Sequence, residues 1–585
     1  MKKTHLPFRL LSLWLALTLP WGFAAPAGAA AGGLARVNIL ADGLTPEVRP
    51  HVGVDCMEQV LQRLVAEDTY PIQGSTCQTN SSGKLPLEEP WIHATGSIVE
   101  VGDNIATWNV CGFSPAILDP NAPQNLEELQ AADPKEVAQL SKFDGRNYGI
   151  ITPVRDQGSS NLCWAYASVN ASEASILREG IDPSATLDTL RFSPTHLGYI
   201  RFNRGPDLLG NTAGEEDPTA DWLQASGSPG YSSTLFSQWW GPVQDGTPMV
   251  NTPSVIEEHS GYRMEHAIEL DGQRLSSNPA ARTRMKEAIA QYGAVTFSYN
   301  WIHEVPYDNP SRGGFGNPHA CTIIGWDDTI PASLFSGGAS QDGGWLVKNS
   351  YSSLPYFYLS YDNNSSYVFA FDYATKEEYD FNYFYDSSVD DFGMAASLNY
   401  TCAANVFQGL KGSDSQTEYV KAVQVGFYGS GATCDVKVYT NLQDQQDMSD
   451  LANVDPTLGT LAASGSATFD RPGYHTVPLE QLAEVAPGSY FSIVVQISGS
   501  SPYLRVIRAA DCKSYVLSKY GAWQKSGLNV PRLKAYTVLE NTSTGLTPEE
   551  TPHASIDDTP EALTGLMPEA TYLVNSAALT AGSPV

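Results

Sequence analysis

Four residues, Gln157, Cys163, His319 and Asn349, constrain this 585-residue chain more than any other feature. Cys163 opens the run CWAYASVNASEASILREG, which is rich in alanine and free of proline. The run predicts a helix that begins at Cys163 and ends at Gly180, a residue type common just past helix ends. The thiol would therefore lie at the N-terminus of a helix.

The chemistry of these residue types suits acyl transfer. A thiol attacks best as a thiolate, and both a nearby imidazolium and the positive end of a helix dipole lower a thiol pKa. His319 would accept the thiol proton, and Asn349 would fix the ring of His319. Gln157, on the turn QGSS, would donate to the developing oxyanion together with the backbone N–H of Cys163. The set predicts a cysteine peptidase.

Several segments in the same order resemble papain-like cysteine peptidases. FDGRNYGIITPVRDQGSSNLCWAYAS, from Phe143, is similar to the nucleophile region of that family, and PHACTIIGWDD, from Pro318, to its histidine strand. GGWLVKNSY, from Gly343, resembles its Asn-Ser-Trp strand, and RMKEAIAQYGAVTFSY, from Arg284, the helix and strand before the histidine. The resemblance implies an α+β peptidase of two lobes, one helical and one made of β-strands, with protein or peptide substrates and a thioacyl-enzyme intermediate.

The chain departs from the family pattern at three places. Ser160 replaces a cysteine that usually forms a disulfide, and the glycine-rich substrate-binding segment is not evident near Gly210. Tyr351 follows Asn349-Ser350 where the family has tryptophan, so Tyr351, with Trp164, is expected to shield the site from water. An alternative is an exported binding or adhesion protein on a papain-like scaffold that has lost its activity.

Residues 1–30 have the pattern of a secretory signal. Lys2, Lys3 and Arg9 precede the apolar run LLSLWLALTL and then small residues, and that run is shorter than the ~20 residues of a membrane-spanning helix. No later segment is long and apolar enough to cross a bilayer. A secreted or cell-surface-associated protein, of bacterial type from the resemblance, is expected. The formal charge of −30 argues against nucleic-acid binding.

Eight cysteines follow the leader: Cys56, Cys77, Cys111, Cys163, Cys321, Cys402, Cys434 and Cys512. If Cys163 stays reduced, seven remain, so at least one more thiol is free. We expect this further free thiol to be Cys321. It lies two residues after His319 in an apolar strand, so its side chain should point to the same face of the strand as that of His319. It either tunes the site or packs as a small buried side chain.

The pattern of elements predicts the domain order. Residues 31–141 form either a propeptide or an accessory subdomain, and residues 142–390 form the peptidase. Helical patterns dominate from Phe143 to Tyr262, including a helix capped by Ser193 with Pro194 in its first turn. A helix ending at Gly293 and the strands AVTFSY, HACTIIGW, GGWLVKN and YFYLSY follow. The insertion between Asp328 and Gly344 is expected to be a solvated loop.

Residues 395–540 predict an all-β sandwich. The strands are KAVQVGFY, CDVKVYT, GYHTVPL and YFSIVVQIS, and the last places Phe491, Ile493, Val495 and Ile497 on one face. The region resembles the lectin-like domain that follows the peptidase in a bacterial subgroup of papain-like enzymes. A carbohydrate or another cell-surface ligand is its expected partner, although plain stabilisation of the peptidase stays open. We expect the side chains of Tyr474 and Tyr490 to pack in the core or at its rim rather than to stack against a bound sugar.

Residues 541–585 are acidic, lack Lys and Arg, and are predicted to be a disordered tail. Competing catalytic motifs are incomplete: HEVPY at His303 lacks the second histidine of a zinc site. We therefore assign no cofactor and no metal to this chain.

Overall fold

The computed structural model describes the core of the chain. The described residues are 95–100, 106–112, 119 and 121–541, except 208, 211–220, 271–277, 302–304, 310–316, 364, 388–401, 500–501, 509–511, 519 and 528. The predicted leader and the predicted tail lie outside the described residues, as does most of the region 31–118. Within that region, β1 (Thr95–Glu100) and β2 (Ala106–Gly112) form an antiparallel pair.

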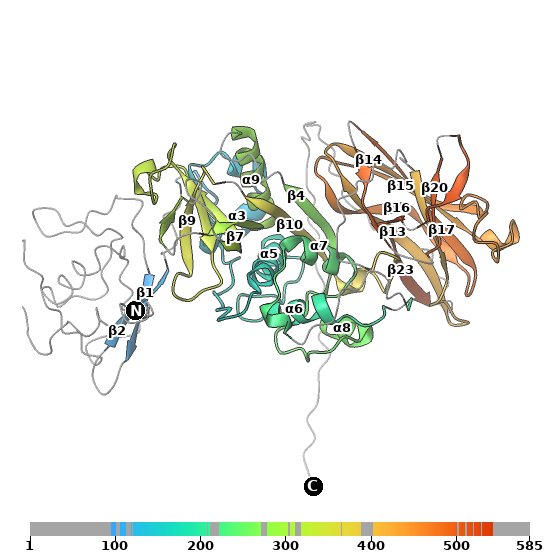
Figure 1. The fold of residues 1–585 in the computed structure, drawn as a ribbon, viewed down its shortest axis with the longest axis horizontal. Helices are drawn as coiled ribbons and strands as arrows, with labels where there is room; N and C mark the ends of the chain where they lie inside the picture. The colour runs from blue at the N-terminus through green and yellow to red at the C-terminus, as the bar shows by residue number, and fades with distance from the viewer. Residues whose placement is uncertain are drawn as a thin grey trace, which may run out of the picture. The chain divides into compact units, whose positions relative to one another are not determined.

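The helical lobe is built around one buried helix. Its helices, which lie together in Figure 1, are α5 (Cys163–Glu179), α6 (Pro194–Asn203), α7 (Pro229–Ser237) and α8 (Pro253–His259). Helix α5 ends where Gly180 adopts a φ of 68°, a conformation that glycine takes without steric cost. The hydroxyl of Ser193 accepts from the backbone N–H of His196 at the start of α6. Both predicted helix boundaries are confirmed.

The sheet lobe follows in the chain. Its strands are β3 (Lys142–Asp144), β4 (Tyr262–Leu270), β5 (Val295–Trp301), β6 (Tyr307–Asp308), β7 (Asn317–Asp327), β8 (Gly344–Lys348), β9 (Tyr356–Ser360) and β10 (Ser366–Thr375). Helix α9 (Pro279–Tyr292) ends at Gly293 as predicted. The short helices α3 (Leu126–Ala131) and α4 (Pro134–Val137) precede β3.

Two parts of the peptidase region differ from the sequence predictions. Phe143 does not belong to a helical segment, because β3 pairs antiparallel with β7 in the sheet lobe. The segment between Asp328 and Gly344 is not a purely solvated loop, because Ile330 and Phe335 are buried in the main core. Apolar side chains at these two positions anchor the segment to the sheet lobe.

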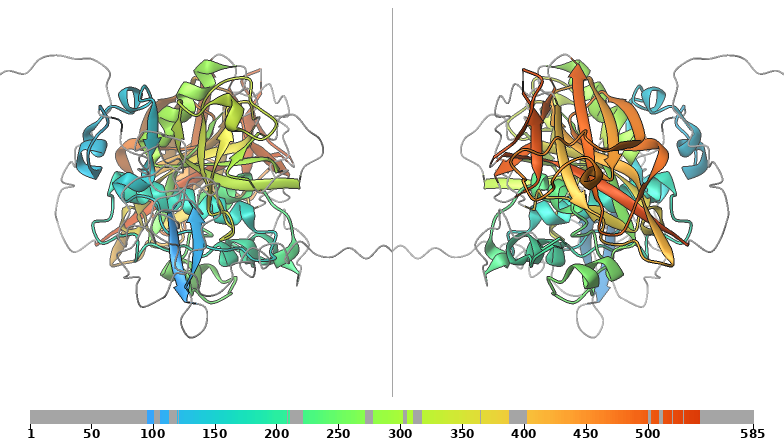
Figure 2. Two further views of the ribbon diagram at one scale, coloured as in Figure 1. Left: turned by 90° about the vertical axis from the view of Figure 1, so that its left-hand side faces the viewer. Right: turned by 90° about the vertical axis from the view of Figure 1, so that its right-hand side faces the viewer.

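The C-terminal domain is a sandwich of two sheets. One sheet contains β11 (Phe381–Tyr383), β13 (Gln416–Tyr428), β16 (Gly473–Val485), β18 (Tyr503–Leu504) and β23 (Leu533–Asn541). The other has the order β15 (Thr460–Phe469), β14 (Ala432–Thr440), β17 (Tyr490–Gly499), β12 (Cys402–Gln408), β20 (Ser514–Leu517) and β21 (Trp523–Lys525). A separate pair joins β19 (Val506–Arg508) to β22 (Asn529–Pro531). The orange and red strands face the reader in the right-hand view of Figure 2.

The two sheets of the sandwich bury one apolar core between them. Phe491, Ile493, Val495 and Ile497 all point into it, which confirms the face predicted for β17. Tyr474 is fully buried and Tyr490 is partly buried, so both take part in packing as predicted.

One sheet runs without interruption from the peptidase into the sandwich. Strand β16 pairs with β4, and the register places Gly473 opposite Ile268 and His475 opposite His266. A Cβ atom on Gly473 would lie 1.8 Å from the backbone oxygen of Ala267, so only glycine permits this approach. The sequence did not indicate this continuity. The two predicted domains therefore share backbone hydrogen bonds rather than a simple surface contact.

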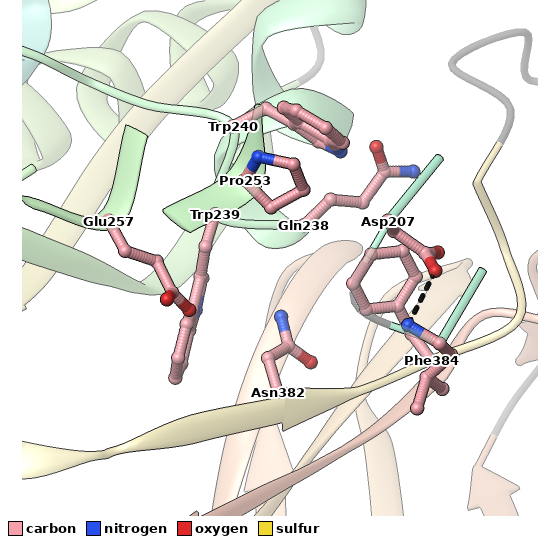
Figure 3. A pocket seen from close by; sticks show the side chains of 9 residues that line it. Asp207, Gln238, Trp239, Trp240, Pro253, Glu257, Asn382 and Phe384 are labelled. Carbon is pink, nitrogen blue, oxygen red and sulfur yellow. Dashed lines mark hydrogen bonds between the residues drawn. The ribbon is translucent and has the colours of Figure 1, made fainter. Parts of the chain in front are cut away.

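Side chains of both parts also line a small pocket beside this shared sheet (Figure 3). Trp239 and Trp240 come from the segment after α7, Glu257 from α8, and Asn382 from β11. Burial raises the pKa of Glu257 above its ordinary value, although Arg263 opposes this shift. The pocket is part of the packed junction between the peptidase and the sandwich.

Candidate active site

Cys163 is the first residue of α5, and its thiol meets the strand that carries His319. The backbone N–H groups of Ala320, Trp164 and Cys163 itself act on the sulfur and lower its pKa, against the larger effect of burial. Ala320 directly follows His319 on β7, so the thiol lies beside the backbone next to the histidine. The nucleophile helix and the histidine strand, which are far apart in the sequence, therefore meet at this point.

Burial is the largest influence on the pKa of the Cys163 thiol. Burial raises the pKa of Cys163, and the surrounding N–H groups only partly oppose this effect. The sequence indicated two groups able to lower this pKa, an imidazolium and the start of the helix, but not the larger opposing effect of burial. Desolvation penalises the thiolate more than the donors at the start of α5 stabilise it.

His319 and Asn349 lie side by side on adjacent strands of the sheet lobe. The Nε2 atom of His319 is 2.9 Å from Oδ1 of Asn349, and both side chains are buried. The Nδ2 group of Asn349 donates to the backbone oxygen of Leu354 at 2.9 Å. This second bond fixes which way the amide faces, so Oδ1 must accept and His319 must donate from Nε2.

The tautomer of His319 follows from that bond. With the proton on Nε2, the other ring nitrogen, Nδ1, is the proton acceptor of the neutral imidazole. Burial lowers the pKa of His319, and the hydrogen bond to Asn349 partly opposes the shift. The ring is therefore held in the neutral form that can take a proton.

Tyr351 covers the imidazole. Its ring stacks on that of His319 with centroids 5.6 Å apart and planes inclined by 24°. The sequence predicts that Tyr351 shields the site in place of the tryptophan found in the family. A stacked phenol ring removes water from one face of the imidazole, which contributes to the burial that lowers the pKa of His319.

Gln157 is held at both ends of its amide. Its Oε1 accepts from the hydroxyl of Ser350 at 2.5 Å, and its Nε2 donates to the backbone oxygen of Ser160 at 2.6 Å. The backbone N–H of Gln157 also donates to the oxygen of Ser350 at 2.8 Å. An amide nitrogen has two hydrogens, so the second remains for another acceptor.

Trp164 directly follows Cys163 in α5 and is fully buried. Its indole meets Tyr231 edge to face, with ring centroids 6.1 Å apart. A Cβ atom on Gly227 would lie 2.4 Å from this indole, so the chain passes closely over it there. The indole therefore packs under the segment that precedes α7, a contact that the sequence did not indicate.

Cys321 also reaches the site. Its sulfur lies 3.5 Å from Oδ1 of Asn349, which also accepts from the backbone N–H of Ser350 at 2.8 Å. The prediction that Cys321 points to the same face as His319 is confirmed. Of the cysteines in the described part of the chain, Cys163, Cys321, Cys402 and Cys434 are free thiols.

A buried network that the sequence analysis missed joins the two halves of the site. Lys348, directly before Asn349, donates to Oγ1 of Thr152 at 3.0 Å and to Oδ1 of Asn170 at 2.9 Å. Thr152 donates in turn to Glu173 of α5 at 2.5 Å. Burial lowers the pKa of Lys348 to about 7, and Glu173 opposes the shift. The sequence could have indicated this network, because Lys348 lies within the apolar run GGWLVKN and a buried ammonium needs hydrogen-bond partners.

The described residues contain no cluster of three or more His, Cys, Asp or Glu side chains able to hold a metal ion. None of the helices in the described part of the chain has the length and apolar character needed to cross a membrane.

Comparison with known proteins identifies structures with a similar fold and the same order of domains. Residues 384–537 match the family described as "Lectin like domain". The crystal structure of the cysteine protease and lectin-like domains of Cwp84, a surface layer associated protein of Clostridium difficile, superimposes with a TM-score of 0.52 at 20% identity. It covers 68% of this chain and 88% of that one. The fold is that of a papain-like cysteine protease followed by a lectin-like domain.

A second structure of Cwp84, after propeptide cleavage, gives the same TM-score and covers 98% of its chain. The papain-like part also has curated relatives. The chain is 22% identical over 241 residues to digestive cysteine proteinase 2 of Homarus americanus and 22% identical over 234 residues to cathepsin L1 of Drosophila melanogaster. These alignments cover 41% and 39% of this chain. The chain spans 66% and 55% of the lengths of these two relatives. The predicted papain-like fold class and the lectin-like resemblance are confirmed, and the relatives support a papain-like cysteine peptidase.

Proposed function

We propose that this protein is a secreted cysteine endopeptidase that hydrolyses peptide bonds through a thioacyl intermediate on Cys163. The observation that carries this proposal is the 2.9 Å contact between His319 Nε2 and Asn349 Oδ1. The backbone N–H of Ala320, next to His319, also lowers the pKa of the Cys163 thiol. Together these features provide a nucleophile, a correctly protonated base and an orienting amide at one place.

In the first half of the reaction, the thiol proton of Cys163 passes to Nδ1 of His319 as the sulfur attacks the substrate carbonyl carbon. The oxyanion that forms accepts from the second Nε2 hydrogen of Gln157 and from the backbone N–H of Cys163. Collapse of the intermediate breaks the C–N bond, and the imidazolium of His319 gives its proton to the departing amine.

In the second half, water attacks the thioester carbonyl carbon and loses a proton to His319. The acid product leaves and the proton returns to the sulfur, which restores the starting state. Burial raises the pKa of Cys163 and lowers that of His319, and both shifts favour the neutral thiol beside the neutral imidazole at rest.

Export and maturation form part of the same proposal. Residues 1–30 act as a cleaved secretory signal, and residues 31–141 act either as a propeptide or as an accessory subdomain. Support comes from the charged, apolar and small-residue pattern at the start of the sequence. Sequencing the N-terminus of the active protein distinguishes the two roles, because a removed propeptide leaves a start near residue 142.

The central test combines covalent labelling with peptide turnover. A thiol-directed epoxide should add one equivalent to Cys163, located by peptide mass spectrometry, and should abolish cleavage of a quenched fluorescent peptide library. Cys163→Ala should lose both labelling and turnover, while Cys434→Ala, the same change in the core of the sandwich, should retain both. Equal turnover by Cys163→Ala, or no labelling at Cys163, would favour the inactive binding or adhesion protein instead.

A further inference from the structure

The segment 121–141, directly before the predicted peptidase region, packs into the core of the peptidase. Leu129 of α3 is 0% exposed and Val137 of α4 is 2% exposed. Both side chains belong to the same apolar cluster as Ile289 and Trp326 of the peptidase. Helix α3 packs on α5, and α4 packs on α9. The apolar surface that these helices cover stays out of water only while the segment is in place.

A buried arginine of the nucleophile helix is bonded to this segment. Arg178, near the C-terminal end of α5, is 6% exposed. Its Nη2 donates to the backbone oxygen of Leu129 at 2.9 Å, and its Nε donates to that of Ala290 in α9 at 2.9 Å. Removing the segment would take away one of these acceptors together with side chains that cover the guanidinium. The segment is therefore joined to α5 by a charge-assisted hydrogen bond as well as by packing.

The segment also supplies a partner to the C-terminal end of α5. The last carbonyl groups of a helix have no acceptor role to fill within the helix itself, so they need donors from elsewhere. Nε2 of Gln130 donates to one of them, the backbone oxygen of Arg178, at 3.0 Å. A Cβ atom on Gly180, where α5 ends, would lie 2.8 Å from the same nitrogen. Gln130 thus lies directly against the end of the helix.

The connection between the segment and the peptidase is part of the paired backbone. The backbone oxygen of Ser141 accepts from the N–H of Asp328 at 2.7 Å. Lys142, the next residue, pairs with Asp327 in the sheet lobe. Proteases cut most readily at exposed loop tips, where the backbone has few hydrogen bonds. The bond between Ser141 and Lys142 is therefore a poor site for cleavage.

The segment lies at the opposite end of α5 from the thiol. Cys163 begins this helix of 17 residues, whereas Leu129 and Gln130 contact its last turn. At 1.5 Å per residue, the two ends are about 25 Å apart. A propeptide that inhibits a peptidase must cover the nucleophile, and residues 121–141 are not placed to do so.

We propose that residues 121–141 remain in the mature peptidase, where they hold the far end of the nucleophile helix, and that activating cleavage spares them. The mature chain then begins before residue 121 rather than near residue 142, the start expected for a removed propeptide. The inference refines the maturation step of the proposed function, but the contacts behind it do not depend on peptidase activity.

Limited digestion of the full chain carrying Cys163→Ala tests the proposal, because all cleavage then comes from the added protease. Subtilisin, a protease of broad specificity, can report any accessible bond. N-terminal sequencing and intact mass of the first stable fragment should show a core that begins before residue 121. A cut anywhere between residues 121 and 141, a core that begins at residue 142 or later, or the absence of a stable fragment would overturn the proposal.

Point variants of the same chain test the contacts within that core. Leu129→Ala leaves a cavity and should lower the thermal midpoint of the core by roughly 5 °C or more. Gln130→Ala removes only the donor to α5 and should lower it by roughly 1–3 °C. Gln139→Ala is the matched control, because Gln139 is exposed and its Nε2 donates to Lys135 within the segment at 3.5 Å. Its midpoint should stay unchanged.

If the segment were lost on maturation, the cores of all three variants would melt at the temperature of the parent core. That result, or an equal drop in Gln139→Ala, would overturn the proposal. Gln130→Ala keeps the test decisive if Leu129→Ala fails to fold. Neither experiment measures catalysis, so their failure is distinct from failure of the proposed peptidase activity.

Discussion

The sulfur of Cys321 lies 3.5 Å from Oδ1 of Asn349, the same oxygen that accepts from His319. A thiol is a weak donor, but here it acts on the amide that orients the base. Burial raises the pKa of Cys321 well above its ordinary value, so the donor proton is retained at neutral pH. We therefore propose that Cys321 is a positioning residue in this reaction.

Replacing Cys321 with alanine should lower kcat by roughly two- to tenfold, the effect of about 1 kcal/mol from one weak hydrogen bond. KM should change little, because the thiol is 2% exposed and makes no substrate contact. Cys321→Ser, which keeps a donor, should recover most of kcat. Steady-state kinetics on one quenched peptide measures both constants. A reduced kcat in Cys434→Ala as well would contradict a specific role for Cys321.

Gln157 should have a larger effect than Cys321, because it donates directly to the oxyanion in the proposed reaction. Gln157→Ala should lower kcat by roughly 100- to 1000-fold. Ser350→Ala removes the hydroxyl that holds Oε1 but keeps the backbone hydrogen bond from Gln157, so its effect should be intermediate. Single-turnover acylation rates provide the measurement. A loss below tenfold in Gln157→Ala would exclude this oxyanion role.

The stacked ring of Tyr351 should set the acid limit of activity. His319 must be neutral to accept the thiol proton, and burial lowers its pKa, so activity persists below pH 6.5 until the ring protonates. Tyr351→Ala exposes the ring to water. The pKa should rise toward its ordinary value, and the acid limb of kcat/KM should move to higher pH.

A pH–rate profile of Tyr351→Ala beside Tyr351→Trp measures this effect. The tryptophan variant keeps an aromatic cover and should retain the acid limb of the natural protein. If both variants shift equally, or if Tyr351→Ala shifts to lower pH, the cover does not control the base.

Local sequence patterns predicted the elements that carry the site. The proline-free, alanine-rich run before Gly180 specified α5, and apolar alternation specified β5, β7 and β8. The helix and the strands depend on residues close in sequence, where helix capping and periodicity apply. The family resemblance around Cys163, His319 and Asn349 indicated which side chains belong to one site, and His319 and Asn349 are in contact.

Properties that depend on burial and on distant contacts could not be predicted. The direction of the Cys163 pKa shift reflects how completely the folded lobes exclude water, which no spacing reveals. Pairing of β4 with β16 joins segments about 200 residues apart through the close approach of Gly473 to Ala267. The hydrogen bonds from Lys348 to Thr152 and Asn170 likewise form only after the lobes pack together.

Acid should destabilise the junction between β4 and β16. The rings of His266 and His475 lie 5.4 Å apart, and that of His475 stacks on Phe469 at 4.3 Å. Burial lowers the pKa of both histidines, although Asp372 partly opposes the shift for His266. Folding therefore favours their neutral forms, so the stabilisation is complete above pH 6.5 and is lost as the pH falls toward the lowered values.

The free energy of unfolding should fall by up to roughly 1.4 kcal/mol per pH unit for each histidine below pH 6.5. His475→Phe keeps an aromatic ring but cannot protonate, so its stability should depend less on pH. Urea unfolding at pH 7.5 and pH 5 measures the difference. An identical pH dependence in the natural protein and in His475→Phe would show that this ring does not contribute.

Gly473 should be the most sensitive glycine at the shared sheet. It has a φ of 141°, and an added Cβ would lie 1.8 Å from the backbone oxygen of Ala267. Gly473→Ala must therefore open the β4–β16 pairing. Gly488→Ala is the matched control, because Gly488 also has a positive φ, of 73°, but open space around it. The control should lose about 1 kcal/mol from backbone strain alone, whereas Gly473→Ala should lose roughly 3 kcal/mol or more.

Thermal and urea unfolding of the two variants measure these losses. Hydrogen exchange should also show faster exchange of β4 amides in Gly473→Ala but not in Gly488→Ala, because only the first variant breaks bonds between the peptidase and the sandwich. Equal destabilisation of the two variants, with β4 still protected, would mean that the β4–β16 pairing accommodates the added methyl group without opening. The close approach of Gly473 to Ala267 would then not be what holds this shared sheet together.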